Sequence, residues 1–163
     1  MRKIAMALLA VLLAACTSID CPVESMVYTI YDLQKPDGTP DTLTVDTMSV
    51  WIHRADGSDT IVYNQLFGPT AYTMSLPISY TQPEDTFYLL TKDTLGHRWR
   101  DTIRVKKDNF PHFESVDCQA TYFHRITAVF TTRHLIDSLI INNPDVNYDL
   151  HNEHFHLRLK ARY

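Results

Sequence analysis

Glycine is scarce in this sequence, with only four among 163 residues. The scarcity excludes the glycine-rich loops that hold phosphate groups, because those loops need glycine where the backbone approaches the phosphate. The chain also lacks a Gly-x-Ser-x-Gly nucleophile elbow and a His-Glu-x-x-His zinc motif. No set of catalytic residues is indicated. We therefore expect that the protein is not an enzyme, and hydrolysis is the least expected of its functions.

Positive charge is in the minority, with 15 Lys and Arg against 19 Asp and Glu and a net charge of −4. This balance disfavours binding to nucleic acid. Long apolar runs are also missing after the N-terminal segment. No later stretch reaches the roughly 18 uninterrupted apolar residues of a membrane-spanning helix. We expect neither a nucleic-acid partner nor a spanning helix in the mature chain.

The N-terminal segment begins with two cations, continues with the uncharged run 4–15 and ends at Cys16. This order is typical of a secretory signal peptide. The exit, Leu13-Ala14-Ala15-Cys16, resembles the bacterial lipobox, in which the cysteine is lipidated and becomes the new N-terminus. The sequence thus predicts a signal peptide at 1–15, a lipidated tether at 16–23 and one domain at 24–163. Two or more acyl chains on Cys16 would attach the protein stably to a membrane.

Only three cysteines are present, Cys16, Cys21 and Cys118. If Cys16 carries lipid, an even pair remains in an oxidising compartment, which favours a disulfide between Cys21 and Cys118. The alternative is two unpaired thiols. A metal site is disfavoured because neither cysteine has another Cys or His at ligand spacing.

The rest of the chain alternates between polar and apolar residues in short runs separated by turn signals. This pattern predicts an all-β domain, an immunoglobulin-like β-sandwich of about 7–9 antiparallel strands. Run 85–91 is apolar enough to be buried on both faces. Run 110–116 is expected to be a short edge strand weakened by Pro111. Run 133–142 could be helical, but its β-branched residues favour a strand. The candidate strands are 26–33, 42–46, 49–54, 59–64, 71–76, 85–91, 98–106, 110–116, 119–131, 137–142 and 154–162.

An Asp-Thr pair followed by an apolar residue recurs at irregular intervals. The physical interpretation is the start of a strand, where Asp bonds its own turn and β-branched Thr begins the extended run. A gathering of these carboxylates around a divalent cation is the alternative. The aspartates are Asp41, Asp46, Asp59, Asp85, Asp93 and Asp101.

Histidines cluster near the C-terminus. A strand would place His154 and His156 on one face, about 7 Å apart and near zinc-ligand reach, with Glu153 or His124 as a third ligand. They are weak metal candidates, because an exposed polar strand face is the favoured explanation. Run 145–149 opens like a calcium loop but lacks the required glycine and bidentate glutamate. We therefore expect no metal or other cofactor.

Two runs present cations at alternate positions. If the runs are neighbours, they form a basic patch that attracts either anionic headgroups or an acidic protein. The alternative is that they are edge strands whose charges prevent edge-to-edge pairing. The cations are Arg98, Arg100, Arg104 and Lys106 in one run and Arg158, Lys160 and Arg162 in the other.

Scattered features resemble a family of small lipoproteins of unknown function from Bacteroidota. The matching features are Cys21, the run 41–45, Tyr63-Asn64, Leu76-Pro77-Ile78, Cys118 and the run 137–142. The resemblance implies a periplasmic or outer-membrane lipoprotein that works beside an outer-membrane β-barrel. It implies no catalytic residues.

The tether after Cys16 bears on the side of the membrane that the domain faces. Surface-exposed lipoproteins of that phylum carry an acidic cluster there, whereas this tether has the single acid Asp20. We expect an outer-membrane anchor with the domain facing the periplasm. The expected function is a structural or interaction module that docks an envelope protein. The alternative is a lipoprotein that binds a glycan, a lipid or a metal.

Overall fold

The computed structural model describes residues 21, 26–41, 47–66, 72–80, 82–93 and 95–160. Within these ranges the chain forms strands and no helix, so the all-β prediction is confirmed, and no described helix could cross a membrane. The signal peptide, Cys16, the candidate strand 42–46 and Arg162 lie outside the described residues. The strands are β1 (Tyr28–Leu33), β2 (Thr47–His53), β3 (Asp59–Leu66), β4 (Thr73–Pro77), β5 (Glu84–Lys92), β6 (Arg98–His112), β7 (Thr121–Thr131), β8 (Ile136–Ile141), β9 (Asp145–Val146) and β10 (Phe155–Leu159).

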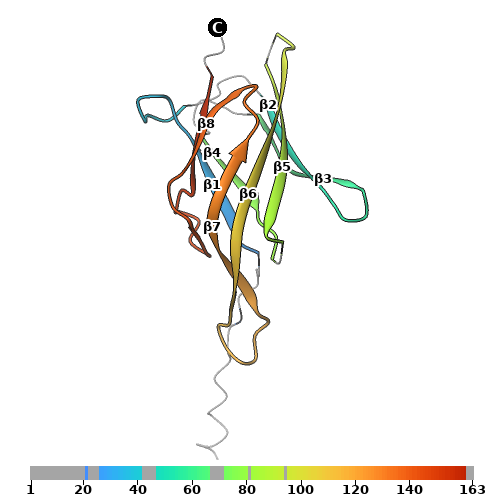
Figure 1. Cartoon of the computed structure of the whole chain (residues 1–163), viewed down its shortest axis with the longest axis vertical. Helices are drawn as coiled ribbons and strands as arrows, with labels where there is room; N and C mark the ends of the chain where they lie inside the picture. Colours follow the sequence, from blue (N-terminus) through green and yellow to red (C-terminus); the bar gives the residue numbers. More distant parts are fainter. Residues whose placement is uncertain are drawn as a thin grey trace, which may run out of the picture.

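The strands form two sheets that pack as a sandwich (Figure 1). One has the order β4-β1-β10-β8 and the other β3-β2-β5-β6-β7-β9. β1 and β10 are parallel, and the other paired strands are antiparallel. The sandwich is therefore as expected, with two differences: the parallel pair and the additional two-residue strand β9. Run 136–141 is a strand, in agreement with its β-branched residues.

The core lies between the two sheets, where alternate residues of each strand meet. The Tyr31 and Phe155 rings stack there, with their centroids 4.7 Å apart. The expectation that β5 is buried on both faces is wrong. Phe87 and Leu89 are buried, but Tyr88 is only half-buried. The reason is that no described strand packs on the outer face of the six-stranded sheet. An apolar run alone does not reveal how many faces of its strand are covered.

β6 extends to His112, beyond the predicted run 98–106. The prediction of a separate edge strand at 110–116 is wrong. Phe110 to His112 continue β6 and pair with β7 as far as the His112–Thr121 register. Pairing with β5 stops at the Lys106–Glu84 register, so the last part of β6 has β7 alone beside it. Proline is tolerated at position 111 because a strand with one neighbour need not donate on both sides.

We call the part of this hairpin beyond β5, residues 107–126, the β6–β7 arm. It projects from one end of the sandwich (Figure 1). We call residues 108–120 its tip, which comprises the end of β6, the loop 113–120 with Cys118 and no residue of β7. The predicted disulfide is confirmed: Cys118 bonds Cys21, with their Cα atoms 5.5 Å apart. The disulfide therefore holds the chain, five residues after Cys16, against the tip of the arm.

Candidate functional site

The tip of the arm exposes large apolar side chains. Phe110 is 51% exposed, Phe113 64% and Val116 96%. Behind them the His112 ring stacks on Phe123, with centroids 4.1 Å apart. The exposed apolar side chains thus lie next to a packed pair of rings, His112 and Phe123. The sequence analysis missed this end because it placed residues 110–116 at the edge of a sheet.

The tip is acidic. No Lys or Arg lies between Lys107 and Arg125, while Asp108, Glu114 and Asp117 fall within that interval. Arg125 is itself paired with Asp145, with 2.7 Å between Nη1 and Oδ1. The tip therefore combines apolar exposure with a negative charge.

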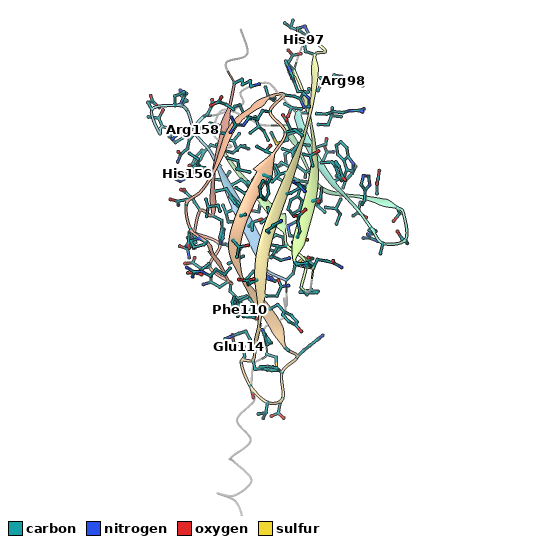
Figure 2. All side chains as sticks on the ribbon, viewed as in Figure 1. His97, Arg98, Phe110, Glu114, His156 and Arg158 are labelled. Atoms are coloured by element: carbon teal, nitrogen blue, oxygen red, sulfur yellow. A yellow bond between two sulfur atoms is a disulfide. The ribbon has the colours of Figure 1, made fainter. Side chains whose placement is uncertain are left out.

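The two basic runs do not form one patch. β6 belongs to the six-stranded sheet and β10 to the four-stranded sheet, so their outward side chains are on opposite faces of the sandwich. Figure 2 shows Arg98 and Arg158 on different parts of the molecule. On β10, Arg158 is half-buried, and Lys160 donates to the carbonyl of Arg133. The cations must therefore be considered separately.

We call Arg98, Arg100, Arg104 and Lys106 the β6 basic face. Arg104 and Lys106 share Glu84, with N–O distances of 3.4 and 3.9 Å. Arg98 and Arg100 form no ion pair within the described part of the chain. The alternative is that these charges protect the edge of a sheet from pairing with another sheet. It is wrong for Arg104 and Lys106, which pair with both β5 and β7 and so are not at an edge. It stands for Arg98 and Arg100, which lie beyond the end of β7.

The aromatic residues do not form a flat glycan-binding platform. Trp51 stacks on Tyr88 on the outer face of the six-stranded sheet. Trp99 is near one end of β6, and Tyr122 pairs with Pro111 near the other. About 40 Å of strand separates those two positions. This arrangement does not favour a glycan ligand.

The histidine pair is not brought together as a set of metal ligands. His154 is fully buried, and its Nδ1 accepts a hydrogen bond from the Ile30 amide at 3.0 Å. It therefore does not belong to an exposed polar face. Instead, His156 Nε2 lies 3.7 Å from Glu153 Oε2. In the parallel pairing of β1 with β10, His156 is opposite Asp32.

The potential ligand atoms of Asp32, Glu153 and His156 lie within 4.8 Å of one another. One imidazole and two carboxylates could hold a divalent cation. However, Arg158 follows on the same face of β10, and its charge opposes a bound cation. Gln34 also donates to Asp32 Oδ2 at 2.8 Å, which leaves only Oδ1 of that carboxylate without a hydrogen-bond partner among the described residues. We therefore assign no metal site to this cluster.

A buried cation lies at the base of the arm. The side chain of Lys107 is 0% exposed, and its ammonium donates to Asp85 Oδ2 at 2.7 Å, Gln82 O at 2.5 Å and Ser79 Oγ at 3.1 Å. An open cleft of about 510 Å³ adjoins Ser79, Gln82 and Asp85. Since all three ammonium hydrogens are donated, Lys107 has no lone pair with which to activate Ser79. The cluster is thus suited to holding the arm on the sandwich.

Sequence reasoning missed Lys107 because the predicted strand ended at Lys106, whereas β6 continues and keeps its alternation through Lys107. The signal that could have revealed it is the Lys-Lys doublet. In an undisturbed strand the second lysine would fall at a core position after Ile103 and Val105.

His124 shares this buried environment. It is 2% exposed and hydrogen-bonds Asn109 Oδ1 through Nδ1 at 2.8 Å. Burial, with a smaller effect of the Lys107 charge and against the opposing effect of Asp85, lowers the pKa of His124 to about 4. The folded protein therefore holds a neutral imidazole there at neutral pH.

The free energy of unfolding is expected to fall on acidification. The unfolded chain protonates His124 near pH 6.5 and the folded chain only near pH 4, so its contribution is complete above 6.5 and is lost as the pH falls towards 4. The loss from His124 is about 3 kcal/mol. Urea unfolding at pH 7 and at pH 4 should show that His124→Asn loses less free energy of unfolding between the two pH values than the wild type does. The control, exposed His151→Asn, should match the wild type. An unchanged pH dependence in His124→Asn would contradict the assignment.

Comparison with known proteins places the chain in a family. No curated protein and no solved structure gives a significant match. A family of unknown function matches residues 42–159, which run from before β2 to the end of β10. This confirms the expected resemblance at the level of a domain of unknown function, while the lipid anchor and the phylum stay predictions. The chain therefore belongs to the family of unknown function DUF6452.

Proposed function

We propose that this protein is an outer-membrane lipoprotein whose domain faces the periplasm and docks an envelope protein without catalysing a reaction. The Cys21–Cys118 disulfide is the observation that carries the proposal. It joins the end of the short N-terminal tether to one end of an elongated sandwich. Such a connection gives the domain a membrane-proximal and a membrane-distal end.

The reach of the tether sets the position of the proximal end. Five Cα-to-Cα steps separate Cys16 from Cys21. Fully extended, they span at most about 18 Å. With lipid on Cys16, Cys21 therefore stays within that distance of the bilayer surface, and the disulfide holds the tip of the arm beside Cys21.

The β6 basic face begins at the distal end. Fourteen Cα-to-Cα steps along β6 separate Arg98 from His112. At about 3.3 Å per residue the two ends are about 45 Å apart. Figure 2 shows His97 and Arg98 at one end, with Phe110 and Glu114 at the other. Charges of headgroups are screened over about 8 Å at physiological salt. This supports an acidic protein partner, such as the periplasmic side of an outer-membrane β-barrel, over lipid headgroups as the ligand of Arg98 and Arg100.

The anchor is tested by Cys16→Ser. We expect the wild-type protein in the membrane fraction and the variant in the soluble fraction, because the variant cannot accept the lipid. A variant that remains in the membrane fraction would show that Cys16 is not the anchor.

Docking is tested by reversing charge at the distal end. Crosslinked envelopes should yield one protein in stoichiometric amount with the wild type, and Arg98→Glu/Arg100→Glu should lose it. Lys35→Glu/Arg54→Glu makes the same charge change at exposed turn positions and should retain the partner. If no protein is recovered with the wild type, the docking proposal is wrong. Equal losses in both variants would refute a specific role for the β6 basic face.

A further inference from the structure

The apolar tip of the arm is exposed at the end of the domain that carries Cys21. Phe113 and Val116 belong to the loop 113–120. Phe110 is among the last residues of β6 that pair with β7 before that loop. Val116 is almost wholly exposed, an unusual position for an aliphatic side chain two residues before a disulfide. Exposed apolar side chains at the end of one hairpin indicate a surface that another apolar phase covers.

The tip is also held firmly. The disulfide fixes one side of the loop through Cys118, whose amide donates to the Ser115 carbonyl at 3.2 Å. On the other side, His112 Nε2 lies 3.0 Å from Glu114 Oε1. The apolar side chains are thus presented by an ordered loop, so little conformational entropy need be lost when they are covered.

We propose that this tip inserts Phe110, Phe113 and Val116 into the interface of the lipid bilayer, as a second membrane contact beside the lipid on Cys16. The inference rests on the proposed anchor, which keeps Cys21, bonded to the tip, within about 18 Å of the bilayer. Apolar side chains at an interface are buried about 5–10 Å into the boundary between headgroups and acyl chains. Together, the lipid and the tip fix the tilt of the domain and point the β6 basic face away from the membrane.

The charge of the tip specifies the kind of lipid surface. Asp108, Glu114 and Asp117 are not offset by any Lys or Arg in the interval between Lys107 and Arg125. Anionic lipids would repel these carboxylates, whereas zwitterionic lipids would not. The contact is therefore hydrophobic, and we expect anionic lipid to give no increase in insertion.

The experiment uses full-length lipidated protein, reconstituted in phosphatidylcholine vesicles with or without brominated acyl chains, which quench nearby tryptophan. Phe113→Trp should emit at shorter wavelength in vesicles, and brominated lipid should at least halve the emission of the added tryptophan. Leu95→Trp is the matched control, because Leu95 is 72% exposed in the turn between β5 and β6 at the distal end. It should not be quenched. Val116→Trp provides a second probe should Phe113→Trp fail to fold.

Vesicle flotation separates the two proposals. Protein that floats but shows no quenching at positions 113 and 116 overturns tip insertion and leaves the anchor intact. Protein that does not float overturns both. A blue shift without quenching shows that protein, rather than lipid, covers the tip, and it also overturns the inference. Stronger quenching on addition of phosphatidylglycerol contradicts the hydrophobic contact proposed for the acidic tip.

Discussion

Replacement of Asp101 by Asn is expected to lower the free energy of unfolding by about 3–4 kcal/mol, one of the two largest effects we predict. The Asp101 carboxylate is 5% exposed and accepts four hydrogen bonds from the segment that connects β7 with β8. Its Oδ2 accepts from the Leu135 and Ile136 amides at 2.7 and 3.0 Å. Asparagine would have to turn an NH₂ group towards one pair of these donors. Urea unfolding at neutral pH measures the loss.

Asp137→Asn is the matched control. Asp137 is exposed on β8, and its carboxylate forms no hydrogen bond or ion pair with another described residue. The control should change the free energy of unfolding by less than about 0.5 kcal/mol. If Asp101→Asn were as stable as this control, Asp101 would not hold the connection that joins the two sheets.

Loss of the disulfide is expected to be comparably damaging. In Cys21→Ser/Cys118→Ser the unfolded chain regains the freedom of a loop whose ends are 97 residues apart. The corresponding destabilisation is about 4 kcal/mol, within the usual range of about 2–5 kcal/mol. Urea unfolding of the double variant under non-reducing conditions measures it.

Reduced wild-type protein provides the control for this prediction. It should unfold at the same urea concentration as the double variant, because both lack the same covalent link. Equal stability of the oxidised wild type and the double variant would show that the disulfide does not constrain the unfolded chain. Cys21→Ser/Cys118→Ser also removes the covalent link between the tether and the tip. Combined with Phe113→Trp, it should weaken the quenching of the added tryptophan without releasing the lipid anchor.

The sandwich was predictable because its strands carry their own local signals. In β6, Ile103 and Val105 alternate with outward cations, and this regular period identifies both the strand and its buried face. Gly57 takes φ 83° in the turn between β2 and β3, where the sequence Asp-Gly indicates a hairpin. Such signals depend only on neighbouring residues.

The Asp-Thr pairs show where local reasoning fails. Asp93 does bond its own turn, accepting from the Leu95 and His97 amides at 2.9 and 2.8 Å. Asp85 and Asp101 instead reach other segments, one to Lys107 and the other to the β7–β8 connection. The same Asp-Thr pair therefore bonds either its own turn or a distant segment. Which partner the aspartate finds depends on which strands the sheet order places beside it.

The candidate site was predictable only in its covalent part. Counting cysteines indicated the pairing of Cys21 with Cys118, but it could not place Cys118 at the tip of an arm. That position depends on β6 continuing through Pro111 after β5 has ended, and on the register shift after Lys106. Both are properties of strand pairing over long sequence separations, which residue patterns do not report.

Mass spectrometry of membrane-extracted protein, digested with trypsin without reduction, tests the central claim most directly. The claim is that the lipidated end of the chain is covalently joined to the tip of the arm. We predict a single species in which a peptide beginning at Cys16 carries a diacylglyceryl group and is linked through Cys21 to the peptide Asp108–Arg125. An unlipidated Cys16, a retained signal peptide, or a Cys118 peptide free of Cys21 would contradict the account.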